Sequence, residues 1–361
     1  MTRLDRFSEE LRRTEYDAAL ISSATNQRYV SGFKYTSGYI LVTREKAYLL
    51  ADFRYIEAAR NTLAGTKFEV IMPEGGMLTE ISCLLEENNV KTLIIEDETV
   101  SCAERDRYAK MFGDKITIVG GASAILSKMR EVKDNEELSL IKKAQSITDA
   151  AFEHILRVMT PNMTEVEIAL ELEFFMRRSG AEDVAFGTIA VSGDTSSMPH
   201  GDAQNRQLQR GFLTMDFGAK YEGYCADMTR TVVIGKADDD MKKLYNTVLS
   251  AQCAALERFG EGVSCYELDK CARDIIEGAG YNGCFGHSLG HGVGMVVHEN
   301  PRLAPSAKRD SVLVRGNVTS CEPGIYVAGK YGCRIEDLVA IELDGSVNNL
   351  TNSPKELIEL F

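Results

Sequence analysis

The chain has 361 residues, of which 44% are hydrophobic and 26% charged, and its formal net charge is −13. This composition is typical of a folded globular protein and excludes collagen-like, mucin-like and wholly disordered chains. The acidic balance predicts no nucleic acid partner, because binding a phosphate backbone requires a basic face and the sequence has no dense Lys/Arg cluster. At roughly 100–200 residues per domain, the length predicts two or three domains.

The sequence also predicts no membrane partner. No stretch approaches about 18 uninterrupted apolar residues, the minimum for a transmembrane helix. The amino-terminal segment MTRLDRFSEELRRTEYD is charged throughout and lacks the apolar region of a signal peptide. The cysteines include no Cys-x-x-Cys pair, which favours reduced thiols over a disulfide framework. We therefore expect a cytoplasmic protein.

The first third of the chain alternates short apolar runs with amphipathic stretches. The apolar runs predict strands at Ala18–Ser22, Tyr39–Thr43, Ala47–Ala51, Phe68–Met72 and Thr92–Glu96. The amphipathic stretches predict helices at Leu4–Arg13, Arg54–Leu63, Leu78–Asn88 and Ala103–Phe112. Strands alternating with helices of this length indicate an α/β domain with a partly parallel sheet.

A charge-dense, apolar-poor passage from Met129 to Glu137 marks a change in organisation. We place a domain boundary there, which gives domains 1–128 and 129–361. Two helix-start signals follow, each a capping residue with Glu three positions later. They are Asp134 with Glu137, opening a helix at 135–159, and Thr164 with Glu167, opening a helix at 165–178.

The second part of the chain repeats one order of elements, in which two helices precede a β-hairpin. After the first helix pair come a strand at Thr188–Val191 and a hairpin at Phe212–Ile234. The second set consists of helices at Asp239–Phe259 and Tyr266–Gly278 and a hairpin near Val318–Glu342. No residue-level repeat accompanies this order. The pattern predicts an α+β domain whose antiparallel sheet is covered on one face by helices.

Each predicted hairpin brings two carboxylates close together across paired strands. Asp216 and Asp227 flank a turn at 220–223, and Glu322 and Glu336 flank Gly329. An acidic residue in an apolar strand costs several kcal/mol unless it is paired, hydrogen-bonded or bound to a cation. The simpler alternative is that each acid is a solvated turn residue or half of a salt bridge, such as Asp227 with Arg230 or Glu336 with Arg334.

Histidine and glycine are concentrated between the two hairpins. Four of the five histidines lie between positions 200 and 298, and the segment Gly286–Gly294 contains two of them among glycines that permit close backbone approach. The remaining one, His154, lies alone on a helical face, and we expect it to be structural. Four carboxylates and one imidazole form a ligand set for two divalent metal ions. An oxygen-rich set favours Mn²⁺, with Co²⁺, Fe²⁺ and Zn²⁺ as alternatives.

At these residues the chain resembles the M24 metallopeptidase family, which has the pita-bread fold and includes aminopeptidase P, prolidase and methionine aminopeptidase. The matching segments, in family order, are MDFG, ADMTRT, GHSLGHGVG, VHENP, EPGIY and RIED. The resemblance implies that two divalent metal ions are held by five residues, namely Asp216, Asp227, His291, Glu322 and Glu336.

The amino-terminal part resembles the creatinase-like domain that precedes the catalytic domain in proline-directed members of this family. The segments Asn26–Phe33 and Ala51–Glu57 carry this resemblance. Such a domain argues against methionine aminopeptidase, which usually lacks it. The complete ligand set argues against creatinase, which has both domains but lacks these ligands.

The family resemblance also implies roles for the remaining site residues. Glu322 would transfer a proton, His200 would lie beside the substrate carbonyl and His298 would stabilise the tetrahedral intermediate. Arg334 would organise the site, and Phe186 would form a wall of the proline pocket.

The implied activity is that of an Xaa-Pro aminopeptidase, which cleaves the bond between an amino-terminal residue and a following proline with a metal-bridging hydroxide as nucleophile. An Xaa-Pro dipeptidase (prolidase) and a non-catalytic binding module are the alternatives. The partner is then a proline-containing peptide, and family analogy implies a homodimer.

Overall fold

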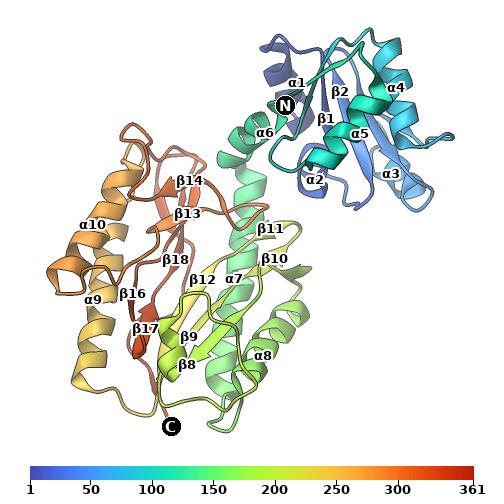
Figure 1. Cartoon of the computed structure of the whole chain (residues 1–361). Coiled ribbons are helices and arrows are strands. Elements are labelled where there is room, and N and C mark those ends of the chain that lie inside the picture. Colours follow the sequence, from blue (N-terminus) through green and yellow to red (C-terminus); the bar gives the residue numbers. More distant parts are fainter. The chain divides into compact units, whose positions relative to one another are not determined.

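The computed structural model describes residues 1–361, which form two compact units, Met1–Met129 and Arg130–Phe361 (Figure 1). Helix α6 (Ala122–Glu131) contains the point of division. None of the helices combines the length and apolar character that crossing a membrane requires.

The first unit is an α/β domain built on one six-stranded sheet. Its strands lie in the order β4-β3-β2-β1-β5-β6, with β1 antiparallel to β2 and parallel to β5. The strands are β1 (Ala18–Ile21), β2 (Gly38–Thr43), β3 (Ala47–Ala51), β4 (Phe68–Ile71), β5 (Thr92–Ile95) and β6 (Thr117–Gly120). The helices are α1 (Arg3–Arg12), α2 (Ala24–Ser31), α3 (Ile56–Thr62), α4 (Met77–Glu87), α5 (Cys102–Phe112) and α6. The partly parallel sheet is confirmed.

Sequence periodicity missed three elements of the first unit, helix α2, strand β6 and helix α6. Helix α2 is short and carries polar residues on its buried side, including Asn26 and Gln27. The fully buried carboxylate of Glu96 accepts hydrogen bonds from the Asn26 amide and from the backbone of Ser22 and Ser23. The Gln27 amide donates instead to the carbonyl oxygens of Ser22 and Gly38. An apolar pattern therefore could not mark this helix.

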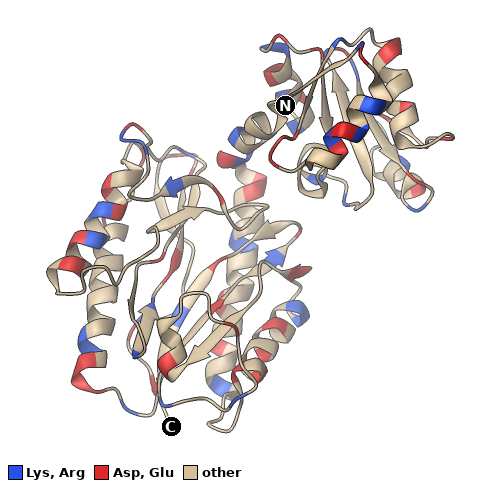
Figure 2. Cartoon of the chain, in the orientation of Figure 1, with Lys and Arg blue, Asp and Glu red and all other residues tan.

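The second unit contains four long helices that flank its strands in two pairs (Figure 1). They are α7 (Asn135–Val158), α8 (Glu165–Arg178), α9 (Asp239–Leu256) and α10 (Cys265–Gly278). Both predicted capping boxes are present, with Asp134 accepting from the backbone of Glu137 and Thr164 from that of Glu167. Charges of both signs are interspersed along these helices (Figure 2), as expected for helices with one solvated face.

The strands of the second unit form two main antiparallel sheets. The first has the order β20-β12-β9-β8 and the second β14-β13-β15-β18-β19, with the small sheets β11-β10-β7 and β16-β17 beside them. The strands are β7 (Asp183–Val184), β8 (Ile189–Ser192), β9 (Gly211–Phe217), β10 (Ala219–Tyr221), β11 (Tyr224–Cys225), β12 (Met228–Ile234), β13 (Gly290–Gly292), β14 (Glu299–Leu303), β15 (Val318–Cys321), β16 (Gly324–Val327), β17 (Tyr331–Arg334), β18 (Asp337–Ile341), β19 (Val347–Asn349) and β20 (Glu359–Leu360). Strands β12 and β20 are the one parallel pair.

Each helix pair shares an apolar core with one of these sheets. Helices α7 and α8 pack with β8, β9 and β12 in a cluster that includes Phe152, Leu172 and Phe217. Helices α9 and α10 pack with β15–β18 in a cluster that includes Leu244 and Leu268. The predicted α+β domain with helices on one face of antiparallel sheet is confirmed. The opposite face of the sheets remains available for a site.

Both predicted hairpins are present, but each is interrupted. Strand β9 pairs with β12, and the chain between them forms a second short pair, β10 with β11. Strand β15 pairs with β18, and β16 pairs with β17 between them. Gly218 forms the break between β9 and β10, where an added Cβ would lie 1.9 Å from the carbonyl oxygen of Ala226. Only glycine allows this close approach.

Candidate active site

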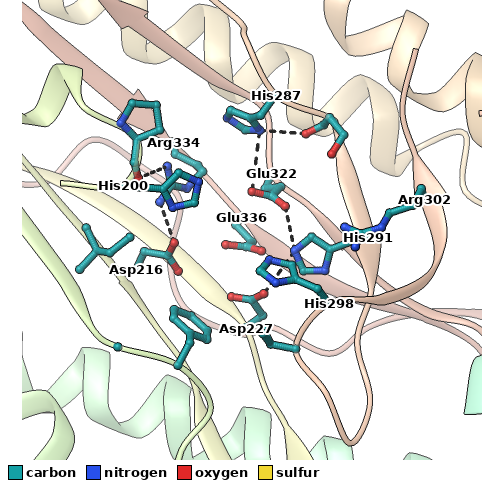
Figure 3. Close-up of a pocket in the computed structure, with 16 residues that line it drawn as sticks. His200, Asp216, Asp227, His287, His291, His298, Arg302, Glu322, Arg334 and Glu336 are labelled. Carbon is teal, nitrogen blue, oxygen red and sulfur yellow. Dashed lines mark hydrogen bonds and ion pairs between the residues drawn. The ribbon is translucent and has the colours of Figure 1, made fainter. Parts of the chain in front are cut away.

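One cavity of about 320 Å³ in the second unit gathers every site residue that the sequence predicts (Figure 3). These residues are Phe186, His200, Asp216, Asp227, His291, His298, Glu322, Arg334 and Glu336. They come from segments far apart in the sequence. The fold therefore brings together residues that the motifs only singled out one by one.

The acidic residues owe their positions to the interrupted hairpins. Asp216 lies on β9, whereas Asp227, Glu322 and Glu336 each lie in a two-residue break between consecutive strands. At a break the backbone leaves the hydrogen-bonded ladder, so the side chain is not restricted to the alternating faces of a strand. The breaks of both hairpins turn carboxylates toward the same cavity.

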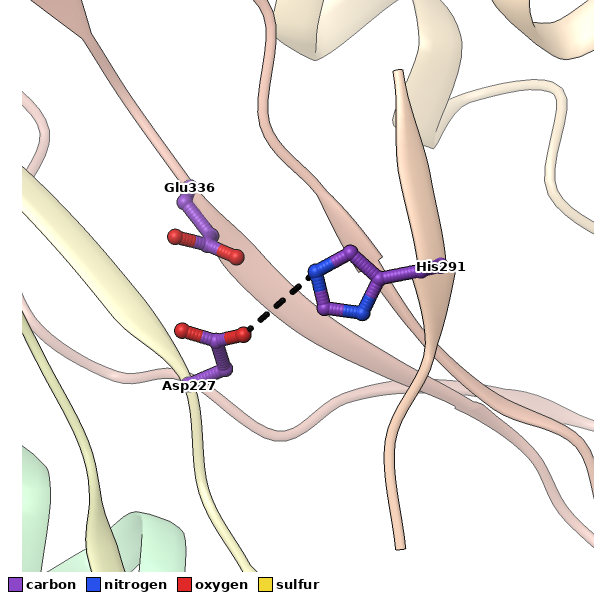
Figure 4. Close-up of side chains that lie close together, drawn as sticks. All are labelled: Asp227, His291 and Glu336. Atoms are coloured by element: carbon purple, nitrogen blue, oxygen red, sulfur yellow. Dashed lines mark ion pairs between the residues drawn. The ribbon is translucent and has the colours of Figure 1, made fainter. Parts of the chain in front are cut away.

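Three of these residues form a compact group of potential metal ligands. One ligand atom from each of Asp227, His291 and Glu336 lies within 4.8 Å of the others, and all three residues are buried (Figure 4). The Nε2 atom of His291 is 3.7 Å from Oδ2 of Asp227 and 3.2 Å from Oε1 of Glu322. Two further carboxylate oxygens in the cavity, Asp216 Oδ1 and Glu336 Oε1, are buried without a hydrogen-bond partner.

The protein alone does not balance the charge of this cluster. Burial and the neighbouring carboxylates, Asp216 and Asp227 respectively, raise the pKa of Asp227 and of Glu336 well above the ordinary range. Burial alone would lower the pKa of His291, but its hydrogen bond to Glu322 and the nearby negative charges raise it to about 9. Excess buried negative charge with unpartnered oxygens is the environment that a cation relieves.

Arg334 links Asp216 to the rest of the cavity wall. Its guanidinium donates to Asp216 Oδ2 at 2.6 Å, to the hydroxyl of Thr229 at 2.9 Å and to that of Tyr326 at 2.7 Å. The salt-bridge alternatives from the sequence are wrong. Arg334 pairs with Asp216 instead of Glu336, and Arg230 pairs with Asp337 at 2.8 Å instead of Asp227.

The remaining histidines divide into those at the cavity and one away from it. The ring centroids of His298 and His291 are 4.3 Å apart, and His200 lines the same cavity. Burial and the charge of His291 lower the pKa of His298. By contrast, His154 contacts Glu171 at 2.7 Å and stacks on Phe175, which confirms its structural role.

Glycine is required on both sides of His291 because neighbouring backbone lies too close for a side chain. Strand β13 lies between β14 and β15. A Cβ at Gly290 would lie 2.1 Å from the carbonyl oxygen of Ser320, and a Cβ at Gly292 would lie 2.0 Å from that of Asn300. The expected close backbone approach is confirmed, and it holds the His291 side chain against the carboxylates.

Three residues of the site escaped the sequence analysis. Thr229 donates from its hydroxyl to Glu336 Oε2 at 2.7 Å, and Tyr326 joins Arg334 to His287 through its own hydroxyl. Arg302 also lines the cavity, and its guanidinium forms no ion pair or hydrogen bond in the structure. No local pattern singled out Arg302, which lies on β14 next to β13.

Comparison with known proteins agrees with this geometry. Residues 139–342 match metallopeptidase family M24, and residues 3–132 match the creatinase/prolidase N-terminal domain. The Xaa-Pro dipeptidase of Pyrococcus horikoshii is 36% identical over 352 residues, which cover 97% of this chain and 97% of that protein.

Two solved structures share the whole fold. An Xaa-Pro dipeptidase from Bacillus anthracis superposes with a TM-score of 0.94 at 36% identity and covers 99% of both chains. The X-Pro aminopeptidase from Thermotoga maritima MSB8 superposes with a TM-score of 0.88 at 39% identity, over 98% of this chain and 99% of that chain. The chain therefore belongs to metallopeptidase family M24, with a creatinase/prolidase N-terminal domain preceding its catalytic domain.

Proposed function

We propose that the protein is a metal-dependent exopeptidase that hydrolyses the bond between an amino-terminal residue and a following proline, as an Xaa-Pro aminopeptidase. One observation carries the proposal. Four carboxylates and one imidazole converge on a single cavity in which two carboxylate oxygens have no partner. The names of the relatives, which include Xaa-Pro dipeptidases and an X-Pro aminopeptidase, support the substrate class.

The proposed cofactor is a pair of divalent cations, which we expect to be Mn²⁺. They would be held by Asp216, Asp227, His291, Glu322 and Glu336. These donors fit, because an oxygen-rich set with one imidazole suits Mn²⁺, with Co²⁺, Fe²⁺ and Zn²⁺ as alternatives. When bound, such ions supply a Lewis acid for a carbonyl group and lower the pKa of water toward about 7.

Glu322 is the residue to which we assign proton transfer. Despite its burial, the hydrogen bond from His291 and the charge of that residue lower the pKa of Glu322. Its carboxylate is therefore ionised at neutral pH and able to accept a proton from water and deliver it to the proline nitrogen that leaves.

Substrate binding falls to residues on the rest of the cavity wall. His298 has a lowered pKa, so its imidazole is neutral at pH 7 and donates an N–H to the oxygen on which negative charge develops. His200 assists from the same cavity, and half-buried Phe186 provides an apolar wall for the proline ring. Arg334 keeps Asp216 in place.

A second candidate, an Xaa-Pro dipeptidase, is favoured by Arg302. A dipeptide carries its carboxylate directly on the proline, and a guanidinium with no partner at the cavity wall is suited to pair with it. Longer peptides place their carboxylate farther from the scissile bond. The two candidates therefore differ in the length of the substrate and not in the chemistry.

The test combines metal analysis with a paired assay. Wild-type protein and Glu322→Gln are loaded with Mn²⁺, and release of the amino-terminal residue is measured for Xaa-Pro and Xaa-Pro-Yaa peptides. Cleavage of the tripeptide supports an aminopeptidase, and cleavage of the dipeptide alone supports a dipeptidase. Protein that binds no divalent metal and shows no difference between wild type and Glu322→Gln would instead be a binding module.

The proposal includes a homodimer, for which family analogy is the support. Light scattering on a sizing column measures it. A mass about twice the 39.9 kDa of one chain is the expected result, and the mass of a single chain would contradict it.

A further inference from the structure

His200 belongs to a long loop, and its own side chain makes no polar contact that would hold it in place. The loop joins β8 to β9 over residues 193–210 and reaches the active-site cavity with Pro199 and His200. The His200 ring is exposed and forms no hydrogen bond or ion pair. The position of this imidazole therefore depends on the contacts that fix the backbone of the loop.

A buried carboxylate joins the two ends of the part of this loop that carries His200. Glu165 is the first residue of α8 and is fully buried. Its Oε1 accepts hydrogen bonds from the backbone N and the hydroxyl of Ser192, both at 2.7 Å. Its Oε2 accepts from the backbone N of Gln204 at 3.0 Å. Ser192 precedes His200 and Gln204 follows it, so one carboxylate closes the loop 193–203.

Arg206 compensates the charge of this carboxylate and strengthens the closure. Its guanidinium donates to Glu165 Oε1 at 3.1 Å, to the carbonyl oxygen of Ser192 at 2.9 Å and to the hydroxyl of Thr195. The backbone N of Glu165 also donates to the carbonyl oxygen of Arg206 at 3.1 Å. A buried carboxylate with this many donors holds its partners in one arrangement, and removing its charge disturbs several of these contacts at once.

The loop has a second support nearer to His200. The hydroxyl of Ser196 accepts from the backbone N of Gly332 on β17 at 3.0 Å. The guanidinium of Arg334 donates to the carbonyl oxygen of Pro199 at 3.3 Å. Arg334 lines the cavity, whereas Glu165 does not. The loop is therefore held at its tip by the cavity wall and at its base by a carboxylate that lies outside the cavity.

We propose that Glu165 is a positioning residue for His200, which sets the place of the imidazole at the cavity by closing the loop. This inference rests on the proposed function, in which His200 assists in substrate binding. A displacement of about 1 Å in a group that contacts the substrate can cost about 100-fold in rate. We expect a smaller loss when Glu165 is changed, about 10-fold in kcat, because the support at the tip remains.

Glu165→Gln tests this assignment. An amide has one accepting oxygen and an NH₂ group that only donates, so it cannot accept from Ser192 and Gln204 on its two sides. We expect kcat for the Xaa-Pro peptide that the wild-type protein cleaves to fall by about 10-fold at saturating Mn²⁺. The matched control is Glu171→Gln, the same substitution on the same helix, where the partner is His154. The control leaves kcat unchanged.

A double-mutant cycle separates positioning from a general loss of structure. In the His200→Ala protein no imidazole remains to be placed, so adding Glu165→Gln changes kcat by less than about 2-fold. A purely structural Glu165 would lower kcat by the same factor with and without His200. Equal factors overturn the inference, and so does a wild-type kcat for His200→Ala.

Hydrogen exchange of the Mn²⁺-loaded protein measures the closure without any reaction. We expect the backbone amides of residues 193–203 to exchange at least about 10-fold faster in Glu165→Gln, whereas those of α9 are unchanged. If Glu165→Gln does not fold, Arg206→Met takes its place, because Arg206 is partly exposed and its loss leaves the carboxylate with its other partners.

The outcomes distinguish this inference from the function on which it rests. Unchanged exchange of residues 193–203 in a folded variant overturns the closure by Glu165. Wild-type protein that cleaves neither an Xaa-Pro nor an Xaa-Pro-Yaa peptide overturns the proposed function and, with it, the catalytic part of this inference. Faster exchange of the loop in Glu165→Gln would still support the closure in that case.

Discussion

The two carboxylate oxygens of Asp216 differ in their hydrogen bonding: Oδ2 accepts from Arg334 at 2.6 Å, whereas Oδ1 is buried without a partner. Arg334 thus orients the carboxylate and leaves one oxygen free to face the cavity. A guanidinium can do this because its planar group reaches Asp216, Thr229 and Tyr326 at the same time.

Replacing Arg334 by Lys tests this orienting role. The ammonium group keeps the charge but is too compact to reach Asp216, Thr229 and Tyr326 at once, so Asp216 loses its fixed position, and kcat falls by about 100-fold. Steady-state kinetics at saturating Mn²⁺ measures the effect, with metal content determined in parallel. Arg315→Lys, in an exposed pair with Glu261, is the control and leaves kcat unchanged. Near-normal activity of Arg334→Lys would refute the role.

The stability of the metal-free protein depends on pH in a direction set by Asp227 and Glu336. Both have a folded-state pKa above the ordinary value, so between about pH 4 and the raised pKa the folded state binds more protons than the unfolded state. The free energy of unfolding therefore falls as pH rises through this window. Thermal unfolding in EDTA from pH 5 to pH 8 measures the slope.

Asp227→Asn provides the comparison for that pH series. The variant removes one buried charge, so we expect a shallower loss of stability with rising pH and a higher Tm than wild type at pH 8 without metal. Parallel pH slopes for the two proteins would show that the acidic cluster does not control the effect.

Mn²⁺ should stabilise the wild-type protein and fail to do so when a ligand is removed. A ligand that binds only the folded state at 100 times its Kd adds about 2.7 kcal/mol to the free energy of unfolding. We expect a rise in the Tm of wild-type protein with added Mn²⁺ and little rise for Glu336→Gln. Differential scanning calorimetry measures both, and an equal rise in the two proteins would place the bound ion elsewhere.

Glu299 is a buried anion between two cations. Its carboxylate lies 3.0 Å from Arg130 and 3.5 Å from Lys133, and it also accepts from the backbone of Val296 in the loop that carries His298. Glu299→Gln removes the ion-pair partner of buried Lys133 and lowers the free energy of unfolding by about 3 kcal/mol.

Chemical denaturation measures the effect of Glu299→Gln. The control is Lys236→Met, which breaks the exposed pair with Glu359 and changes stability by less than about 1 kcal/mol. A similar small change for both variants would mean that water reaches the Glu299 cluster.

Replacing each of two glycines by alanine compares a position packed against the backbone of a neighbouring strand with a position that faces open space. Gly290→Ala places a Cβ 2.1 Å from the carbonyl oxygen of Ser320, whereas at Gly286 the same atom meets nothing within 4 Å. We expect Gly290→Ala to lower the free energy of unfolding by about 3 kcal/mol and Gly286→Ala to change it by about 0.5 kcal/mol or less. Urea unfolding measures both free energies, and equal changes in the two variants would contradict the close packing of Gly290 against β15.

Local signals predicted much of this fold. The helix at Glu165–Arg178 has the predicted bounds because a capping pair and regular apolar spacing coincide there. The two carboxylate hairpins were predictable because the turn segment 220–223 and Gly329 lie at the midpoints between the acids. The predicted helix at 239–259 was too long, since α9 ends at Leu256 before a turn that leads to Gly260.

Long-range pairing was not predictable from local pattern. Arg334 and Asp216 are 118 positions apart, and the sequence offered Glu336 as a nearer partner for the arginine. Arg302 escaped for a related reason. Its significance depends on β14 lying beside β13, which the strand order of the sheet determines and no local motif encodes.

The division of the ligand set between two halves of the catalytic domain has a consequence for folding. Asp216 and Asp227 come from the half of the catalytic domain that ends with β12, whereas His291, Glu322 and Glu336 come from the half that begins with α9. Hydrogen bonds join the halves beside the cluster, including Glu336 N to Thr229 O at 3.1 Å and Cys225 N to Gly294 O at 2.8 Å.

Neither half alone contains the whole ligand set, so a cation held by these residues binds only after the halves have docked. The binding free energy of the cation then opposes separation of the two halves, so the ion would stabilise the folded domain in addition to its role in catalysis. Loss of the metal would therefore raise the rate at which the two halves separate, and this separation would precede the unfolding of either half.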